Sequence, residues 1–423
     1  MVGAMLIDAA GEAMACLDGE REMRTTWNFF TAGQLLFGRG SVGELGFLAA
    51  RRGYQRVLIV TDRVLVEAGI VEQVRRPLEE QRITVEVFDG GEAEPSIDAA
   101  LRAVEHARAF AGDAILGLGG GSNMDLAKIT ATVFAHGGAP SDYFGYDNVP
   151  GPVTPLICVP TTSGTGSEVS HAAVLTDTAA AIKVSTLSQH LRPTLAVVDP
   201  LLTVSCPRQV TADSGIDALT HAIEGYTATH YSQLALGPGE TNAYEGSHPL
   251  GDCLAEKAIR LIGEHLVTAV REPSNLDARE GMSLAATIAG MAFSNCGVAV
   301  VHALEYPMGG VLHCSHGAGN GLLLPYVMRY NLPERTAELA HVAEWLGEDT
   351  VGLSQDDAAE RAIAAVERLR HDIGIPTRIR ELGGSEEQLP QFAEKAFAIS
   401  RLMEMNPRRP TQADLLGILR EAL

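Results

Sequence analysis

Aromatic residues and cations are scarce in this chain of 423 residues, and each shortage excludes a class of partner. Phe, Trp and Tyr make up only 5% of the sequence, so stacking platforms for single-stranded nucleic acid are not expected. Lys and Arg number 32 against 53 Asp and Glu, which gives a formal net charge of −21. Such a charge repels nucleic acids and acidic membrane surfaces on average. We therefore expect neither a nucleic-acid partner nor a membrane partner.

Membrane-spanning runs and paired cysteines are also missing. No uninterrupted apolar stretch reaches the roughly 20 residues that cross a bilayer. The first twenty residues carry Asp8 and Glu12 and have no basic start, so a secretory signal is not expected. The six cysteines form no C-x-x-C pair, which excludes a zinc ribbon and a thioredoxin-like motif. The sequence predicts a cytoplasmic protein with free thiols and with a mobile N-terminal extension over residues 1–25.

What the sequence does contain is a regular alternation of short β-branched runs and helical segments. The runs lie at 57–60, 83–88, 113–121, 155–162 and 195–200. Segments of helical period lie between them, notably at 64–81 and 97–110. This order is typical of a mainly parallel sheet covered by helices on both faces. After about Pro207 only helical periodicity continues, so we predict an α/β domain over 26–205 and an all-helical domain over 206–423.

A glycine-rich turn follows one of the predicted strands. Gly119, Gly120, Gly121 and Ser122 end that strand and open a helical segment. Glycines let backbone N–H groups approach a ligand closely, and a helix N-terminus favours phosphate. The motif is not G-x-G-x-x-G, so a simple tight turn is the alternative to a phosphate site. Lys128, on the same helix, could face the phosphates or could be a solvated helix residue.

Two further features at strand ends fit a nucleotide. The loop 159–168 carries five hydroxyls and two glycines after a buried strand, where open α/β sheets bind their ligands. The alternative is a polar loop that caps its own helix. Asp62 follows another strand and could accept hydrogen bonds from ribose hydroxyls, while its charge would repel a 2′-phosphate. Asp62 thus implies NAD rather than NADP, with a helix N-cap as the alternative role.

The helical half holds a candidate metal site. Asp217 and His221 are four residues apart on a predicted helix, so their side chains share one face. His302 lies in an apolar stretch, and His316 follows a turn. One carboxylate and three imidazoles suit Fe(II) or Zn(II) better than Mg(II) or Ca(II). An ordinary helix contact and buried core histidines are the alternatives, and His313 is a rival ligand.

Taken together, these motifs resemble those of the iron-containing, group III alcohol dehydrogenases. The resemblance covers nearly the whole chain after residue 28. The motifs that carry it are FGRGSVGELG at 37–46, VLIVTD, GGGSNMD, PTTSGTGSEV, DSGIDALTHAIEGY, VHALEYPMGG, HGAGNGLLLPYVMRYN and NPRRPT at 406–411. It implies an α/β domain that binds a nicotinamide dinucleotide, a helical domain that holds the catalytic metal, and an active site in the cleft between them.

The resemblance also assigns residues. It implies that the metal ligands are Asp217, His221, His302 and His316. It places at the dinucleotide the residues Asp62, Gly120, Gly121, Ser122, Asp125, Thr161, Thr162, Thr165 and Lys183, and Gly119 belongs to the same turn. The metal is expected to be Fe(II) rather than Zn(II), although intrinsic affinity favours Zn(II) and availability in the cell decides occupancy.

Three departures from the family pattern bear on the site. Asn123 stands where the family commonly has Pro, which should loosen the turn without removing the phosphate site. Tyr306 stands where many members have a further His near the nicotinamide, and it is our candidate catalytic residue. A phenol with a pKa of about 10 is a poorer proton shuttle than an imidazole at neutral pH. The segment 231–252 looks like an insertion similar to one in the hydroxyacid-oxoacid transhydrogenase branch.

The expected activity is hydride transfer between NAD(H) and a small primary alcohol or its aldehyde. A hydroxyacid-oxoacid transhydrogenase is an open alternative. A dehydroquinate-synthase-like lyase would need a cluster of Lys and Arg near Asp217, His302 and His316, and the sequence shows none. Members of the family are often dimers, so we expect a homodimer in which the strand-like stretch 28–38 pairs across a two-fold axis.

Overall fold

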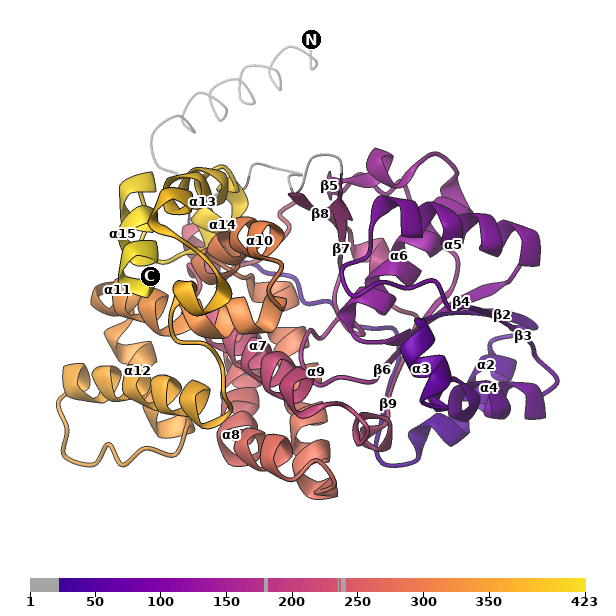
Figure 1. Ribbon diagram of the computed structural model, residues 1–423, viewed down its shortest axis with the longest axis horizontal. Coiled ribbons are helices and arrows are strands. Elements are labelled where there is room, and N and C mark those ends of the chain that lie inside the picture. The colour runs from indigo at the N-terminus through magenta and orange to yellow at the C-terminus, as the bar shows by residue number, and fades with distance from the viewer. Residues whose placement is uncertain (1–22, 179–181, 235, 237–240) are drawn as a thin grey trace, which may run out of the picture.

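The computed structural model describes residues 23–178, 182–234, 236 and 241–423. Figure 1 shows an α/β part, in indigo to magenta, beside a helical part that runs from rose (α7) through orange to yellow. The change from sheet to helices falls between β9 (Leu195–Val198) and α7 (Arg208–Thr227). The predicted fold class is therefore confirmed, whereas the domain boundaries at 25 and 205 stay predictions.

The main sheet of the α/β part is parallel throughout. Its six strands run in the order β1-β9-β6-β4-β2-β3. Besides β9 they are β1 (Leu35–Phe37), β2 (Arg56–Val60), β3 (Thr84–Phe88), β4 (Ala114–Gly119) and β6 (Leu156–Pro160). All five strands expected from the β-branched runs are present. Of the strand-like stretch 28–38, only β1 forms, and it pairs with β9 at the sheet edge. Pairing of this stretch across a two-fold axis stays a prediction.

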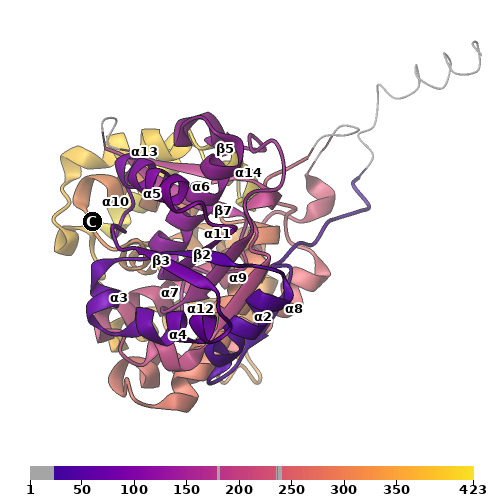
Figure 2. The ribbon, with the colours of Figure 1, turned by 90° about the vertical axis from the view of Figure 1, so that its right-hand side faces the viewer.

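Helices cover both faces of this sheet because alternate strand residues point to opposite sides. On β2, Leu58 and Val60 pack beneath α5 (Ile97–Phe110) and α6 (Gly121–His136), whereas Val57 and Ile59 pack on the other face. That other face is covered by α2 (Leu45–Arg51) and α4 (Ile70–Glu80). Figure 2 shows the two layers above and below the strands. These four side chains of β2 are fully buried.

The segment predicted as one helix at 64–81 is two helices. These are α3 (Arg63–Glu67) and α4, and the break between them is at Gly69. Gly69 has a φ of 73°, a left-handed conformation that no helix interior contains and that glycine adopts at little cost. The apolar periodicity continues across Gly69, so the sequence pattern did not indicate the break between the two helices.

A second, smaller sheet was not predicted. It consists of β5 (Gly145–Tyr146), β7 (Ala172–Asp177) and β8 (Ile182–Leu187). One face of β8 is turned toward the helical part: Leu187 belongs to the helical core, and Lys183 and Ser185 contact α10 and α14. These three residues alternate along the strand, as side chains on one face must. The small sheet thus joins the two parts of the molecule.

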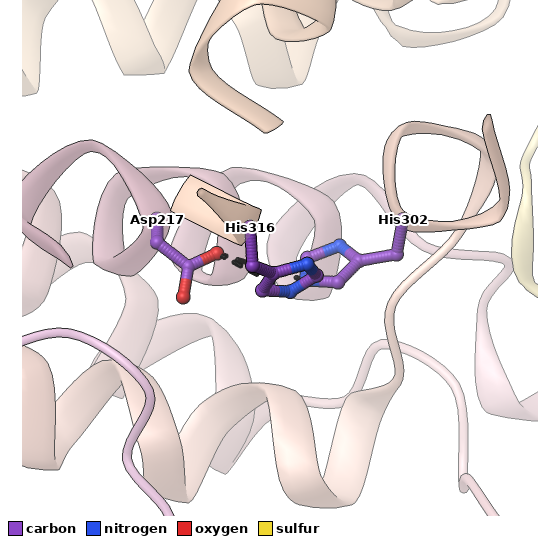
Figure 3. Close-up of side chains that lie close together, drawn as sticks. All are labelled: Asp217, His302 and His316. Carbon is purple, nitrogen blue, oxygen red and sulfur yellow. Dashed lines mark ion pairs between the residues drawn. The ribbon is translucent and has the colours of Figure 1, made fainter. Parts of the chain in front are cut away.

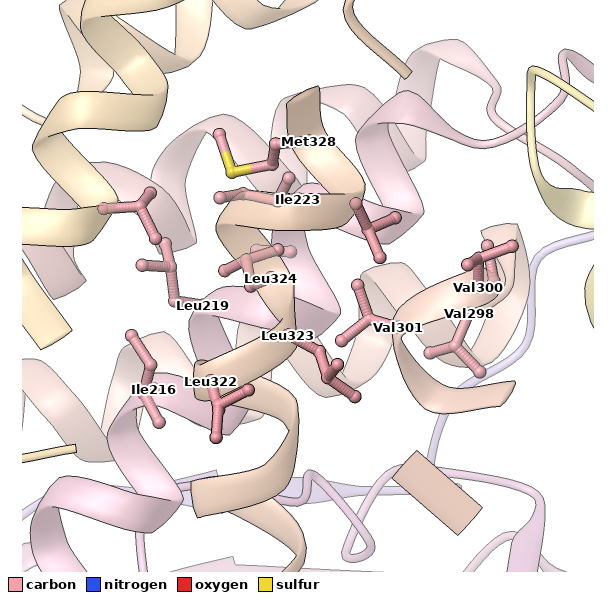
Figure 4. Packing of buried hydrophobic residues seen from close by; sticks show 14 of the residues in the cluster. Ile216, Leu219, Ile223, Val298, Val300, Val301, Leu322, Leu323, Leu324 and Met328 are labelled. Atoms are coloured by element: carbon pink, nitrogen blue, oxygen red, sulfur yellow. The ribbon is translucent and has the colours of Figure 1, made fainter. Parts of the chain in front are cut away.

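The helical part is built around α7. It also contains α8 (Pro249–Arg271), α9 (Leu276–Cys296), α10 (Val300–Leu312), α11 (His316–Trp345), α12 (Gln355–Asp372), α13 (Leu389–Phe397), α14 (Ser400–Met405) and α15 (Gln412–Ala422). Short 3₁₀ helices occur in both parts of the molecule, at Ser41–Glu44, Pro140–Tyr143, Gln189–Leu191, Pro200–Thr203, Tyr231–Gln233, Ile379–Leu382 and Glu386–Gln388. Figure 4 shows Ile216 and Leu219 of α7 against Leu322 and Leu323 of α11. This packing brings the middle of α7 and the starts of α10 and α11 together.

Membrane-spanning character is weak among the described helices. None of them is long and apolar enough on its own to cross a bilayer. Taken as a pair, α9 and α10 meet the length and composition required, and they are bent by 104° where they join.

The N-terminal segment is attached to the segment 231–252. Arg24 forms an ion pair with Glu245, and Asn28 Nδ2 donates to Glu245 Oε1 at 3.1 Å. The Trp27 ring stacks on His248 with ring centroids 4.2 Å apart. Arg24 is thus held by the 231–252 segment, whereas the extension over residues 1–25 stays a prediction and its residues 1–22 lie outside the described residues.

Two glycines allow the loop after β6 to touch α9. Gly166 has a φ of 61°, and a Cβ built on Gly290 of α9 would lie 2.7 Å from the Gly166 Cα. Real Cβ atoms do not approach backbone so closely, so this contact requires glycine at position 290. The loop therefore packs against the helical part through backbone atoms.

We expect Gly290→Ala to lower the free energy of unfolding by about 1–3 kcal/mol, the usual cost of overpacking. The matched control is Gly417→Ala on α15, where nothing lies within 4 Å of the added methyl group. That change should raise the free energy of unfolding by about 0.4–1 kcal/mol, because alanine has less conformational freedom to lose. Urea denaturation of both variants measures the difference, and equal stabilities would contradict the close approach.

Candidate functional site

Three of the four predicted metal ligands converge. Asp217 comes from α7, His302 from the first turn of α10, and His316 is the first residue of α11. Their ligand atoms all lie within 4.8 Å of one another. Both histidine Nε2 atoms are 3.9 Å from Asp217 Oδ1. Figure 3 shows the carboxylate and the two rings pointing toward one another.

The fourth predicted ligand lies beside this cluster. His221 Nδ1 is 3.9 Å from the other Asp217 oxygen, Oδ2, which confirms that the two residues share one face of α7. The His221 ring stacks on Phe293 at 4.0 Å and on His302 at 4.8 Å. Burial lowers the pKa of His221 to about 3, so the ring is neutral and keeps a lone pair. Its Nδ1 is buried and has no hydrogen-bond partner among the described residues.

The rival ligand His313 is not in the cluster. It is the C-terminal cap of α10, with a φ of 52°, and its side chain is exposed. The chain turns from α10 into α11 at residues 313–315, with Cys314 and Ser315 between the two histidines, which places them in different surroundings.

Two buried carboxylates orient the ligand histidines. Glu224 Oε2 lies 2.6 Å from His302 Nδ1, and Glu224 Oε1 accepts from the Val301 N–H at 2.7 Å. Glu305 is fully buried and pairs in the same way with His316 Nδ1. Each Nδ1 therefore carries the proton and donates it, and each Nε2 is left with a lone pair that faces Asp217.

Neither carboxylate was predicted, although a sequence signal for both existed. Glu224 lies one helical turn after His221 and two turns after Asp217, and Glu305 lies three residues after His302. Acidic residues at these spacings share a helix face with the predicted ligands.

Asn320 marks the point on which the ligand atoms converge. Its Nδ2 lies 2.8 Å from Asp217 Oδ1, 3.2 Å from His302 Nε2 and 3.1 Å from His316 Nε2. An amide nitrogen has only two protons, so it cannot satisfy three acceptors. Asn320 Oδ1 is buried and has no partner among the described residues. Lone pairs without protons around one point are what a cation requires.

The spacing of the ligand atoms also fits a metal ion. Ligands at about 2.1 Å from a tetrahedral metal lie roughly 3.4 Å apart, so the separations of 3.9 Å need to close by only about 0.5 Å. Burial favours neutral Asp217, but its histidine neighbours, His221 first, outweigh burial and lower the pKa of this carboxyl group. The residues present therefore fit a divalent metal.

The two loops predicted to hold the dinucleotide contact each other. Gly120 is the N-cap of α6 and provides no side chain to cap it, so the first N–H groups of α6 are free to bind an anion. A Cβ built on Gly121 would lie 2.7 Å from Thr165 Cγ2, and one built on Gly120 would lie 3.4 Å from Thr162 Oγ1. Gly119 has a φ of 141°, which favours glycine.

Other residues predicted to bind the dinucleotide have internal partners. Asp125 accepts from Ser167 Oγ at 2.7 Å and from the Val174 N–H at 3.0 Å. Ser122 Oγ donates to the Ala93 carbonyl, and the buried Thr161 donates its N–H to the Gly119 carbonyl at 2.9 Å. These contacts hold α6 to β7 and to the neighbouring loops, and contact with a dinucleotide stays a prediction for all three.

Asp62 and Asn123 are linked. Asp62 is the N-cap of α3, since its Oδ1 accepts from the Leu65 N–H at 3.0 Å. Asn123 Nδ2 donates to Asp62 Oδ2 at 2.6 Å and to the Leu118 carbonyl at 3.1 Å. The expectation that Asn123 loosens the turn is wrong, because its buried amide ties the turn to β2. The N-cap role of Asp62 is confirmed, and the ribose contact stays a prediction.

Neither role considered for Lys128 is correct. Its side chain is fully buried, so it is not solvated. Its Nζ donates to the Ala172 carbonyl at 2.8 Å and to Ser170 O and Oγ at 3.1 Å, so it does not face the glycine-rich turn. Lys128 fastens α6 to the start of β7, and burial lowers its pKa.

Lys183, predicted to contact the dinucleotide, forms ion pairs on both sides. Its Nζ lies 2.9 Å from Glu94 Oε1 and 3.5 Å from Glu305 Oε1. Burial disfavours the charged amine, but Glu305 and Glu94 outweigh it and raise the pKa of Lys183. The charge on the carboxylate that orients His316 is therefore compensated from β8.

Tyr306 lies against the ligand histidines. Its ring stacks on His316 at 5.9 Å and meets His302 edge-on at 6.3 Å. Burial raises the pKa of Tyr306, so its hydroxyl keeps its proton at neutral pH. The position suits contact with a substrate, and a catalytic role stays a prediction.

Known proteins agree with this fold and site. The iron-containing alcohol dehydrogenase family matches residues 32–200, and the family's C-terminal region matches residues 240–423. The NAD-dependent methanol dehydrogenase of Bacillus methanolicus is 38% identical over 396 residues, which is 94% of this chain and 100% of that protein. The mitochondrial hydroxyacid-oxoacid transhydrogenase of Bos taurus is 32% identical over 92% of this chain and 88% of that protein.

A solved structure of a 1,3-propanediol oxidoreductase superposes with a TM-score of 0.88 at 36% identity, over 94% of this chain and 100% of that one. The chain belongs to the iron-containing alcohol dehydrogenase family. Membership supports an enzyme that uses a nicotinamide dinucleotide and a divalent metal, as the resemblance implies.

We expect Glu305→Gln to weaken the binding of Zn(II) or Co(II) about 10- to 100-fold, the usual effect of losing a carboxylate that orients a metal-binding histidine. Competition with a chromophoric chelator measures this affinity. The matched control is Glu86→Gln, which alters an exposed carboxylate 3.5 Å from the surface residue His106 and should leave the affinity unchanged. Unaltered metal affinity in Glu305→Gln would show that Glu305 does not orient His316.

Proposed function

We propose that the protein interconverts small primary alcohols and their aldehydes, with NAD(H) and one divalent metal held by Asp217, His221, His302 and His316. The observation that carries the proposal is the convergence of lone pairs on one point. Two of the imidazoles are held there by Glu224 and Glu305, which leave their Nε2 atoms free. Such an arrangement has no use in a purely structural core, where it would be an unsatisfied cost.

The residues of this chain divide the work of the reaction. A bound divalent metal supplies Lewis-acid polarisation of the substrate oxygen, and the dinucleotide supplies hydride chemistry. The free N–H groups at the start of α6 hold the dinucleotide pyrophosphate. Asp217 and His302 are each only 2% exposed, whereas the His316 side chain is 32% exposed, so a substrate would reach the centre on the His316 side. Tyr306 keeps its proton and donates a hydrogen bond to the substrate.

The metal we propose is Fe(II) rather than Zn(II). The ligand set consists of nitrogen and oxygen atoms, and no described cysteine belongs to the cluster. Such a set accepts either ion, and intrinsic affinity favours Zn(II). The supply of each metal in the cell then decides which ion occupies the site. The family to which the chain belongs is the iron-containing one, which favours Fe(II).

A hydroxyacid-oxoacid transhydrogenase is the second candidate, and the bovine relative of that name, 32% identical over 92% of this chain, favours it. Both functions use the same hydride transfer and differ in whether NADH leaves. Free NADH formed from 4-hydroxybutyrate alone favours the dehydrogenase, whereas conversion that requires 2-oxoglutarate favours the transhydrogenase.

Removal of the metal should abolish turnover. After stripping with a chelator, NADH formation from short primary alcohols should return only when Fe(II) or Zn(II) is added. His302→Ala should lower the rate about a thousandfold, because metal polarisation contributes several kcal/mol to the barrier. His313→Ala, which alters the exposed neighbouring histidine, is the control and should keep its rate. Full activity of metal-free protein would exclude the proposed mechanism.

Replacement of Asp62 should relax the choice of cofactor. Asp62→Ser keeps an N-cap for α3 but removes the charge that repels a 2′-phosphate. We expect kcat/KM for NADP relative to NAD to rise about 10- to 100-fold, because a like-charge contact costs several kcal/mol. Asp113→Asn is the control, since Asp113 lies at the amino ends of the strands, opposite to Asp62, where it accepts from the Gln55 and Arg56 N–H groups. A ratio unchanged by Asp62→Ser would place the adenosine elsewhere.

A further inference from the structure

Arg401, on the short helix α14, has an incompletely satisfied guanidinium. Its side chain is half-buried, and its Nη2 donates to Ser185 Oγ at 3.0 Å. Its Nε is buried and has no hydrogen-bond partner in the described part of the chain. None of the ion pairs between described residues involves Arg401, so this cation has one neutral partner and no anion.

Other buried arginines of this protein are better satisfied. Arg279, which is 2% exposed, and Arg192, which is 8% exposed, each donate to at least three oxygen acceptors. Arg370 also has a buried Nε without a partner, but its guanidinium lies over the Tyr326 ring at 5.3 Å. A buried guanidinium nitrogen without an acceptor is costly, so the Arg401 site is suited to an anion that supplies one.

The position of Arg401 relates it to the candidate metal site. Ser185 lies two residues beyond Lys183 on the same face of β8, about 7 Å along the strand. Lys183 Nζ is 3.5 Å from Glu305, which is bonded to His316. Arg401 is therefore attached to the same strand face that contacts the site.

The helix α10 connects Arg401 to the site from the other side. It packs on both β8 and α14, and it carries His302 and Tyr306. Arg401 and Tyr306 therefore belong to helices that pack against each other.

We propose that Arg401 binds the carboxylate of the substrate, so that the preferred substrates are hydroxy acids whose hydroxyl and carboxylate are separated by a few carbons. This rests on the proposed function, because the hydroxyl must reach the metal ligands while the carboxylate reaches Arg401. The planar guanidinium offers paired N–H donors that match the two oxygens of a carboxylate. In a chain of net charge −21, a cation without an ion pair among the described residues would select an anionic substrate over its neutral analogue.

The test compares matched substrates in the metal-loaded enzyme. The hydroxy acids 3-hydroxypropionate, 4-hydroxybutyrate and 5-hydroxyvalerate are set against 1-propanol, 1-butanol and 1-pentanol. Arg401→Met should lower kcat/KM for the best hydroxy acid about 10- to 100-fold, mainly by raising KM. The same variant should change kcat/KM for the neutral alcohols less than about two-fold. Arg401→Lys keeps the charge and should restore part of the preference.

The control variant is Arg335→Met. Arg335 is another largely buried arginine of the helical part, and its guanidinium donates to the Thr227 and Ala228 carbonyls. Its loss tests the general effect of removing a buried guanidinium. Arg335→Met should lower kcat/KM for hydroxy acids and for alcohols by the same factor, or for neither.

Three outcomes would overturn the proposal. An equal loss for acids and alcohols in Arg401→Met would make Arg401 structural. A weaker NADH affinity in that variant, with the substrate preference unchanged, would assign the anion to a phosphate of the dinucleotide. If the loaded wild-type enzyme turns over no alcohol at all, the proposed function fails instead. Calorimetric binding of glutarate to the wild type but not to Arg401→Met would then still support the carboxylate site, and equal binding would refute it.

Discussion

The hydrogen bonds from His302 and His316 to two buried carboxylates are the interactions on which the candidate site depends. Glu224 and Glu305 fix which nitrogen of each ring carries the proton, so the other nitrogen faces Asp217. Each carboxylate needs its own support: Glu224 also binds the backbone at the start of α10, and Glu305 is charge-compensated by Lys183. Since Lys183 belongs to β8, the metal site depends on packing between the α/β part and the helical part.

The fold and the ligand positions could be predicted because local patterns determine them. Buried parallel strands consist of nearly continuous β-branched runs, and all five such runs became strands. Asp217 and His221 share a face of α7 because four residues make about one helical turn. The short turn between α10 and α11 returns His316 to the vicinity of His302, although Pro307 and Gly309, which suggested a turn, lie inside α10.

The partners of these residues could not be predicted, because they come from elements far apart in the sequence. Lys183 and Glu305 are separated by more than a hundred residues, and so are Ser185 and Arg401, so no periodicity relates them. Lys128 shows the same difficulty, since its burial follows from carbonyl groups at the start of β7. The small sheet was missed because β7 and β8 are half-buried, β7 has only the short apolar run AAVL, and β8 has none.

The most direct test of the central claim is anomalous X-ray diffraction from crystals of protein reconstituted with Fe(II) or Zn(II), recorded at the absorption edge of the metal. We expect one peak among Asp217 Oδ1, His302 Nε2 and His316 Nε2, about 2.0–2.2 Å from each. His221 should have moved toward the metal, and the Nδ1 atoms of His302 and His316 should still be bonded to Glu224 and Glu305. A peak elsewhere, or ligation through Nδ1 with both carboxylate contacts broken, would contradict this account of the site.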